Sequence, residues 1–150
     1  MLFGPEPFDA PDVEALTRAQ QAELRGLDGR GDIGPTRDAR MFEPPDGVFL
    51  VGRDDGDALV CGGICRFDEA RAELKRMFVV AEARGRGYGR KLLSALEAEA
   101  RGLGYAGIVL ETGVQQAAAL GLYESAGYVP IPCYGIYAGQ SISRCFEKQL

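Results

Sequence analysis

The chain has 150 residues, a length that fits one domain with a sizeable buried core. Hydrophobic residues make up 46% of it and charged residues 26%, as in ordinary globular proteins. The net charge of −5 argues against a general nucleic-acid binder, which needs a broad basic face. No apolar run is long enough to span a membrane, and residues 1–11 lack the basic and apolar regions of a signal peptide. We therefore expect one cytoplasmic domain over residues 1–150, without nucleic-acid or membrane partners.

The chain has four cysteines and no histidine. The cysteines are Cys61, Cys65, Cys133 and Cys145, and their spacing without histidine gives no zinc pattern, so no metal is expected. Buried reduced thiols in a cytosolic protein are the favoured interpretation. Because no Cys–His pair can exist to activate a thiol, a covalent route through cysteine is disfavoured.

The first third of the chain predicts a helix followed by a long loop. Asp9 is a candidate cap and Pro11 lies near the first turn of a helix whose apolar residues continue to about Leu27. The segment 28–45 is rich in glycine, charge and proline, and it predicts a loop with one short helical turn. Loops of that length within a domain often serve function.

Three antiparallel strands in a meander are predicted next, over residues 47–53, 58–67 and 72–80. Gly62 and Gly63 interrupt the second of these strands. In a strand, glycine marks a bulge or a closely approaching neighbour.

The second half of the chain predicts alternating strands and helices. The expected elements are a helix over 87–103, a strand over 107–112, a helix over 115–126 ended by Gly127, and closing strands over 128–131 and 141–148. A strand, a helix and another strand in succession favour one parallel pair. The whole pattern predicts an α+β fold with a mixed sheet.

A glycine-rich turn connects the strand ending at residue 80 to the helix that follows. The turn, RGRGYG over residues 84–89, would aim free backbone N–H groups and a positive helix end at one point, which suits phosphate. Its glycines do not have the spacing of a dinucleotide fingerprint or a P-loop. They do fit the pattern [RQ]-x-x-G-x-[GA].

At this motif the chain resembles the GNAT superfamily of acetyl-CoA-dependent N-acyltransferases. The resemblance covers roughly residues 48–150 and continues through 73–80, 110–113, 122–128, 134–137 and 145–148. It implies a GNAT-like fold, with a mostly antiparallel central sheet, a splayed parallel pair and flanking helices. The resemblance also implies that a homodimer is possible, because family members are often dimers.

The resemblance implies a site for acetyl-CoA as co-substrate. The pyrophosphate is expected on the N–H groups of the turn and the pantetheine arm along the preceding strand. Gln116 stands where many members have an asparagine that contacts pantetheine. The residues implied are Phe78, Val79, Val80, Arg84, Gly85, Arg86, Gly87, Tyr88, Gly89, Arg90 and Gln116.

Tyr123 and Glu73 are the catalytic residues that the resemblance implies. Tyr123 matches a family tyrosine near the thioester sulfur, and a phenol is protonated at pH 7 and able to protonate a leaving thiolate. The alternative for Tyr123 is a core aromatic. Glu73 matches a glutamate base found in some members, with a solvated strand-end carboxylate as its alternative and Glu111 as the second candidate base. Strand alternation places Glu73, Lys75, Met77 and Val79 on one face.

The predicted activity is direct transfer of an acetyl group from acetyl-CoA to a primary amine in a ternary complex. The alternative is a non-catalytic acyl-CoA-binding or sensing module. Acceptor selection is expected from residues 28–45, from the loop 130–134 and from Tyr137. Lys75 and Arg76 would suit the carboxylate of an amino-acid acceptor, but a charged outer strand face is the favoured interpretation of this pair.

Overall fold

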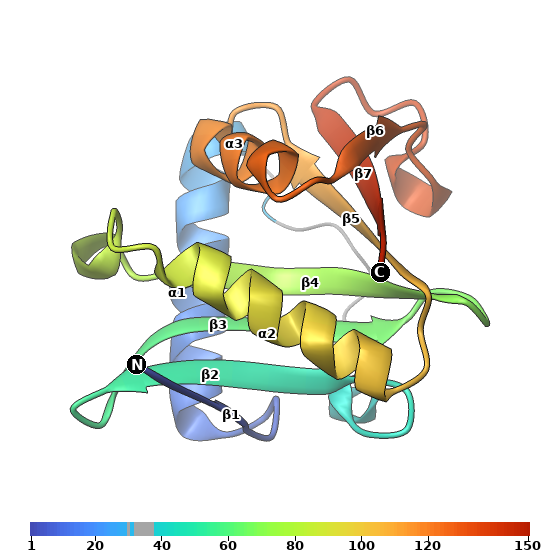
Figure 1. Cartoon of the computed structure of the whole chain (residues 1–150). Helices are drawn as coiled ribbons and strands as arrows, with labels where there is room; N and C mark the ends of the chain where they lie inside the picture. The colour runs from blue at the N-terminus through green and yellow to red at the C-terminus, as the bar shows by residue number, and fades with distance from the viewer. Residues whose placement is uncertain (30, 32–37) are drawn as a thin grey trace.

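A seven-stranded mixed sheet organises the fold, in the order β1-β2-β3-β4-β5-β7-β6 (Figure 1). The computed structural model describes residues 1–29, 31 and 38–150. Within them, only β4 and β5 pair in parallel and all other neighbours are antiparallel, which confirms the predicted mixed sheet. The strands are β1 (Leu2–Pro5), β2 (Val48–Asp54), β3 (Asp57–Arg66), β4 (Arg71–Val79), β5 (Gly107–Gly113), β6 (Val129–Ile131) and β7 (Ser143–Gln149).

Helices cover both faces of this sheet. Figure 1 shows α2 crossing the near face over β3 and β4, α1 behind the sheet, and α3 beside β5 and β7. Among the described residues, no helix is long and apolar enough to cross a membrane. The helices are α1 (Pro11–Asp28), α2 (Tyr88–Gly102) and α3 (Ala117–Ser125), with the short 3-10 turns η1 (Ala39–Phe42), η2 (Ala81–Ala83) and η3 (Gly135–Tyr137).

The N-terminal third agrees with its prediction except at two points. The helix starts at Pro11 as expected, but its N-cap is Ala10, which makes no side-chain cap bond, so the assignment of Asp9 as the cap is wrong. The strand β1 was not predicted, because its four residues show no alternation. The short helical turn expected in the loop 28–45 is η1, and residues 30 and 32–37 of that loop lie outside the described residues.

Two hydrophobic clusters form the core, one on each face of the sheet. Leu92, Leu93 and Leu96 bring α2 onto the near face, and Val13 and Leu16 bring α1 onto the other. The approach of α2 depends on a glycine in β3. A Cβ atom at Gly62 would lie 3.2 Å from Leu92 and 3.3 Å from Leu96, which confirms the expected close neighbour.

A β-bulge in β4 reverses the faces of its second half. Gly63 lies opposite Lys75 and Cys61 opposite Phe78, so two steps on β3 face three on β4. Arg76 occupies the bulge with φ +61°.

The bulge contradicts the predicted alternation along β4. Glu73 lies opposite Cys65, a member of the α1-side cluster. Met77 and Val79 instead pack against the α2-side cluster, on the other face. The shared face expected for Glu73, Lys75, Met77 and Val79 is therefore wrong beyond Lys75, because one extra residue shifts a two-residue period by one step.

The parallel pair separates part-way along its length. Pairing between β4 and β5 runs from Arg71 opposite Gly107 to Leu74 opposite Leu110. Both strands continue further, β4 to Val79 and β5 to Gly113. The predicted splay is confirmed, and it begins directly after Leu74.

The cysteines do not all behave as expected. Cys61 and Cys65 are buried free thiols, as predicted. Cys133 and Cys145 form a disulfide with a Cα–Cα distance of 5.1 Å, so the prediction of reduced thiols is wrong for this pair. Pairing of β6 with β7 places Ile131 opposite Cys145, which brings Cys133, two residues later, within bonding reach.

Candidate active site

A groove of about 540 Å³ lies between α1 and α3, across the end of β4. Leu24 and Leu27 of α1 form one wall, and Leu122 of α3 belongs to the opposite wall. The glycine-rich turn and the first residues of α2 close one end. The remaining lining residues are Gln20, Glu23, Met77, Phe78, Val79, Ala83, Arg84, Gly85, Gly87, Tyr88, Gly89, Arg90, Gln115, Gln116, Ala117, Ala118, Ala119 and Tyr123.

The glycine-rich turn presents backbone donors to this groove. Gly85 and Gly87 have φ values of +78° and +79°, which only glycine adopts without strain. Gly87 is the N-cap of α2 and makes no side-chain cap bond. The backbone bond from Lys91 N to Gly87 O is 3.1 Å long, and the N–H groups before Lys91 have no acceptor inside the helix. The turn therefore offers N–H groups and a helix dipole to an anion.

Two arginines at this end of the groove are held by other protein groups. Arg84 donates to Glu23 over 2.7 Å and to the Val79 carbonyl over 3.0 Å, and it lies 5.6 Å above the Phe78 ring. Arg90 bonds to the Ser125 hydroxyl. Because Glu23 offsets the charge of Arg84, backbone N–H groups carry more of the anion affinity than the count of arginines implies.

A smaller cavity of about 60 Å³ opens where β4 and β5 separate. Glu73 and Lys75 border it from β4, Glu111 and Thr112 from β5, and Tyr137 from η3. The residues that line both this cavity and the groove are Gln20, Leu24, Met77, Gln116 and Tyr123. The two spaces thus share one wall, which faces the end of the parallel pairing.

Tyr123 is part of this shared wall. Its side chain is buried, and its hydroxyl lies 3.7 Å from the sulfur of Met77. Burial raises the pKa of the Tyr123 phenol above its ordinary value, and the nearby Glu111 carboxylate raises that pKa further. The phenol is therefore protonated at neutral pH. It also packs edge-on against Tyr128 with ring centres 5.8 Å apart, so Tyr123 is a core aromatic that also borders both spaces.

Two carboxylates border the smaller cavity with different hydrogen-bond partners. Glu73 accepts a bond of 3.1 Å from the Tyr134 hydroxyl, and Glu111 accepts one of 2.6 Å from the Ser143 hydroxyl. Burial and the Glu73 charge together raise the pKa of the Tyr134 phenol, so Tyr134 remains a donor. Glu73 is half-buried against this cavity, so it is not a solvated strand end.

Known proteins are similar to this chain in both sequence and architecture. Residues 13–128 match the sequence profile of the Acetyltransferase (GNAT) family. A relative from Azospirillum brasilense, named IAA acetyltransferase, is 39% identical over 126 residues, which cover 80% of this chain and 82% of that protein. The chain belongs to the GNAT family. It is accordingly an acetyl-CoA-dependent N-acetyltransferase.

Solved GNAT structures have the same fold. An acyl-CoA N-acyltransferase from Klebsiella pneumoniae aligns with a TM-score of 0.85 and 31% identity, over 99% of this chain and 97% of the other. An acetyltransferase from Salmonella typhimurium, solved with acetyl-CoA, aligns with a TM-score of 0.71 and 23% identity, over 100% of this chain and 94% of the other. The second similarity shows the shared fold.

Most residues expected to bind the cofactor line the groove between α1 and α3, and two do not. Val80 packs with the α1-side cluster and its N–H donates to Leu59 O over 2.9 Å. Arg86 lies at the turn, where its guanidinium donates to Glu82 O over 3.2 Å. Gln116, just before α3, borders both spaces.

Two features of the smaller cavity were not foreseen from sequence. Tyr134 was placed in an acceptor-selecting loop but not paired with Glu73, 61 residues away. Lys75 was interpreted as part of a charged outer strand face, yet it is only 8% exposed and contacts Tyr137. That interpretation is wrong for Lys75, because the loop after β6 folds over its face of β4.

Three of the four cysteines of this GNAT domain are poor nucleophiles. Burial raises the pKa of the Cys61 thiol to about 12, so it stays protonated at neutral pH. Cys133 and Cys145 are bonded to each other. Over the described part of the chain, no three His, Cys, Asp or Glu side chains come together as a metal site.

Proposed function

We propose that this domain, residues 1–150, moves an acetyl group from acetyl-CoA to a primary amine by direct attack in a ternary complex. The amine belongs to a small molecule, an amino acid or a peptide. The observation that carries the proposal is the shared wall at Met77 and Tyr123, where the large groove meets the small cavity. A donor in the groove and an acceptor in the cavity would meet there.

The groove suits the shape and charge of CoA. Its volume of about 540 Å³ falls in the range of roughly 300–1,000 Å³ common for ligand sites. N–H groups of the turn, from Arg84 to Arg90, would bind the pyrophosphate. The apolar side chains of Leu24 and Phe78 would contact the pantetheine arm. The Gln116 amide, at the start of α3, would bond to a pantetheine amide.

The separated strands would supply hydrogen-bond donors to the thioester carbonyl. Beyond Leu74, β4 has no β5 partner, so its backbone N–H groups on that side are available to a thioester carbonyl. Donors fixed before the reaction stabilise the negative charge that develops on this oxygen.

Two side chains would move the protons of the reaction. Glu73 would take a proton from the acceptor ammonium, leaving a neutral amine whose nitrogen attacks the carbonyl carbon. As the carbon–sulfur bond breaks, the Tyr123 hydroxyl would give its proton to the sulfur. Its raised pKa keeps that proton in place until the thiolate forms. The bonded nitrogen would lose its extra proton to water as it becomes an amide, and the Tyr123 phenolate would regain a proton from water.

Replacing Tyr123 by phenylalanine tests the proposal. We expect Tyr123→Phe to lower kcat about 100-fold or more, because general-acid catalysis typically contributes that much. The affinity for acetyl-CoA, measured by calorimetry, should stay unchanged. CoA release with a panel of primary amines gives the rates.

Tyr128→Phe is the matched control, since Tyr128 packs on Tyr123 but borders neither space. Its kcat should stay within about twofold of the parent enzyme if the hydroxyl of Tyr123 matters rather than aromatic packing. Full activity of Tyr123→Phe would contradict the acid role. Tight binding of acetyl-CoA without turnover on any amine would favour the acyl-CoA-binding module instead.

A further inference from the structure

Lys75 is a buried cation on the wall of the smaller cavity. Its side chain is only 8% exposed. Nζ donates to the Tyr137 hydroxyl over 3.4 Å and lies 5.9 Å from the centre of that ring. Among the residues that the structure describes, no carboxylate forms an ion pair with Lys75. Lysine is rarely buried without a charged partner, so an anionic ligand group would complete the contacts of this side chain.

The acidic side chains around the same cavity already accept other hydrogen bonds. Glu73 accepts from Tyr134, and Glu111 accepts from Ser143. Asp28 accepts from the backbone N–H of Gly31 over 3.1 Å. The cavity thus presents negative charge from several sides, and positive charge from Lys75 and Arg76 of β4. Such a pattern matches a molecule that carries both an ammonium and a carboxylate.

We infer that Lys75, oriented by Tyr137, binds the carboxylate of the acceptor, and that the acceptor is a small free α-amino acid. The inference rests on the proposed function and names its substrate class. An ammonium group has three donors, so two remain on Lys75 after its bond to Tyr137. Glu73 and Lys75 are two residues apart on one face of β4, about 6–7 Å along the strand. The adjacent amino and carboxylate groups of an α-amino acid fit between them.

The size of the cavity favours a small acceptor. Its volume of about 60 Å³ holds a few water molecules, since one water needs about 10–15 Å³ of such space. That room suits the head group of glycine or alanine. A peptide N-terminus has no carboxylate next to its amine, so Lys75 would remain unpaired beside it.

The test compares amino acids with their amides. Alanine and alaninamide, and glycine and glycinamide, differ only in the carboxylate, and rates are compared per neutral amine because an amide lowers the pKa of the adjacent amine. The parent enzyme should show kcat/KM at least about tenfold higher for the acids, as expected for a charge-assisted bond to a buried cation. Lys75→Met should lower kcat/KM for the acids about 10- to 100-fold and leave the amides within about threefold, while Lys75→Arg retains the preference.

Controls and a second readout separate this inference from the proposed function. Lys91→Met makes the same change at an exposed lysine that borders neither space, and it should keep the parent preference. Turnover on amines without any preference for acids, or a preference that survives Lys75→Met, would overturn the inference and leave the proposed function standing. Calorimetry of alanine binding to the CoA-loaded protein covers the case of no turnover at all. Binding that Lys75→Met abolishes supports the subsite, and no binding to the parent protein overturns it.

Discussion

At the scale of single residues, Glu73 and Glu111 are both candidates for the base because both border the smaller cavity. Glu73 accepts its bond from the half-buried phenol of Tyr134 on the loop that covers the cavity, whereas Glu111 is bonded to Ser143 on the neighbouring strand. Ser143 lies directly beside β5 in the sheet, so its bond holds Glu111 toward β7. Glu73 lies on the same face of β4 as Lys75. It is therefore better placed than Glu111 to meet the amine of an acceptor whose carboxylate would bind Lys75.

We expect Glu73→Gln to lower kcat about 100-fold at pH 7 and to lose less at higher pH. An amide cannot accept the ammonium proton, but the fraction of neutral amine rises with pH and makes the base unnecessary. A pH–rate profile over pH 6–9 measures this. Glu111→Gln is the matched control, and its profile should follow that of the parent enzyme. If Glu111→Gln shows the greater loss and the same recovery with pH, Glu111 is the base.

Sequence alone predicted roles for Tyr123 and Glu73, which stay predictions, but it did not predict the environment of Lys75. The first two follow from motifs in which neighbouring residues carry the pattern. The burial of Lys75 depends on Tyr137, 62 residues later, and strand alternation shows which face a side chain takes but not what covers that face. Contacts between segments distant in the sequence therefore determine which charged side chains are buried in this cavity.

At the scale of elements, hydrophobic periodicity and glycine punctuation predicted most boundaries to within about two residues, as for α2 and β5. A bulge or a close neighbour was expected at Gly62 and Gly63, and the register shift between β3 and β4 lies between Cys61 and Gly63. The sequence did not show that Arg76 of β4 is the extra residue, because a non-glycine residue at φ +61° has no sequence signature. The strand β1 was missed because four residues are too few for a period, and only pairing with β2 defines it. The position of the bulge and the strand β1 both depend on pairing with a neighbouring strand, which a single strand's sequence does not encode.

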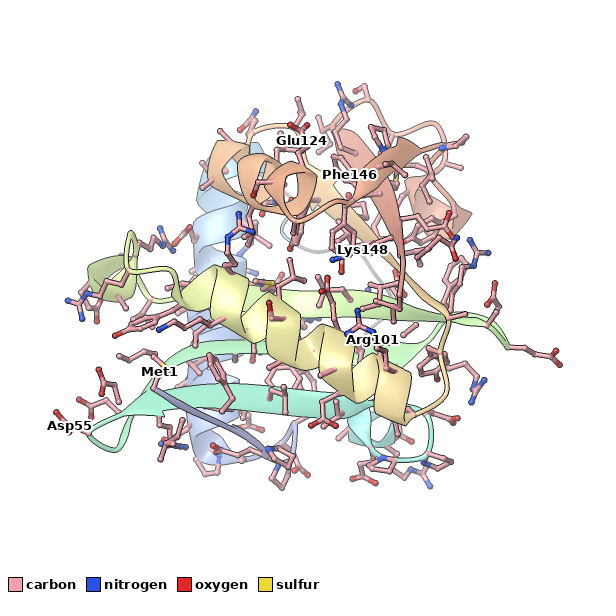
Figure 2. All side chains as sticks on the ribbon, viewed as in Figure 1. Met1, Asp55, Arg101, Glu124, Phe146 and Lys148 are labelled. Atoms are coloured by element: carbon pink, nitrogen blue, oxygen red, sulfur yellow. A yellow bond between two sulfur atoms is a disulfide. The ribbon has the colours of Figure 1, made fainter. Side chains whose placement is uncertain are left out.

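A buried carboxylate on α2 connects this helix to the closing strands. Glu97 is buried, accepts a bond of 3.0 Å from Tyr128 and forms an ion pair of 3.1 Å with Lys148 of β7. Lys148 is labelled in Figure 2. We expect Glu97→Ala to lower the free energy of unfolding by about 2 kcal/mol, because the Tyr128 hydroxyl and Lys148 lose their partner. Urea unfolding measures the change. The control is Glu99→Ala at an exposed position of the same helix, and equal losses in the two variants would contradict a specific role for Glu97.

At the scale of the whole molecule, the groove proposed for the donor and the smaller cavity proposed for the acceptor are built from different parts of the chain. The groove uses α1, β4 and α3, and the acceptor cavity adds Tyr137 from the loop between β6 and β7. That loop also carries Tyr134, and the Cys133–Cys145 disulfide connects its start to β7. The GNAT motif in the sequence lies on the groove, whereas the smaller cavity depends on contacts between segments distant in the sequence.

Removing the disulfide should therefore weaken acceptor binding and leave the donor site intact. The double variant Cys133→Ser/Cys145→Ser should lose about 2–3 kcal/mol of unfolding free energy, as expected for a crosslink that closes a short loop. Its KM for the amine should rise severalfold, because Tyr134 and Tyr137 are held less firmly over Glu73 and Lys75, whereas its KM for acetyl-CoA should not change. Thermal unfolding and steady-state kinetics, with and without reductant, measure both effects. Reductant should reproduce them in the parent enzyme and do nothing further to the variant, and an unaffected parent enzyme would show that the closure does not depend on this bond.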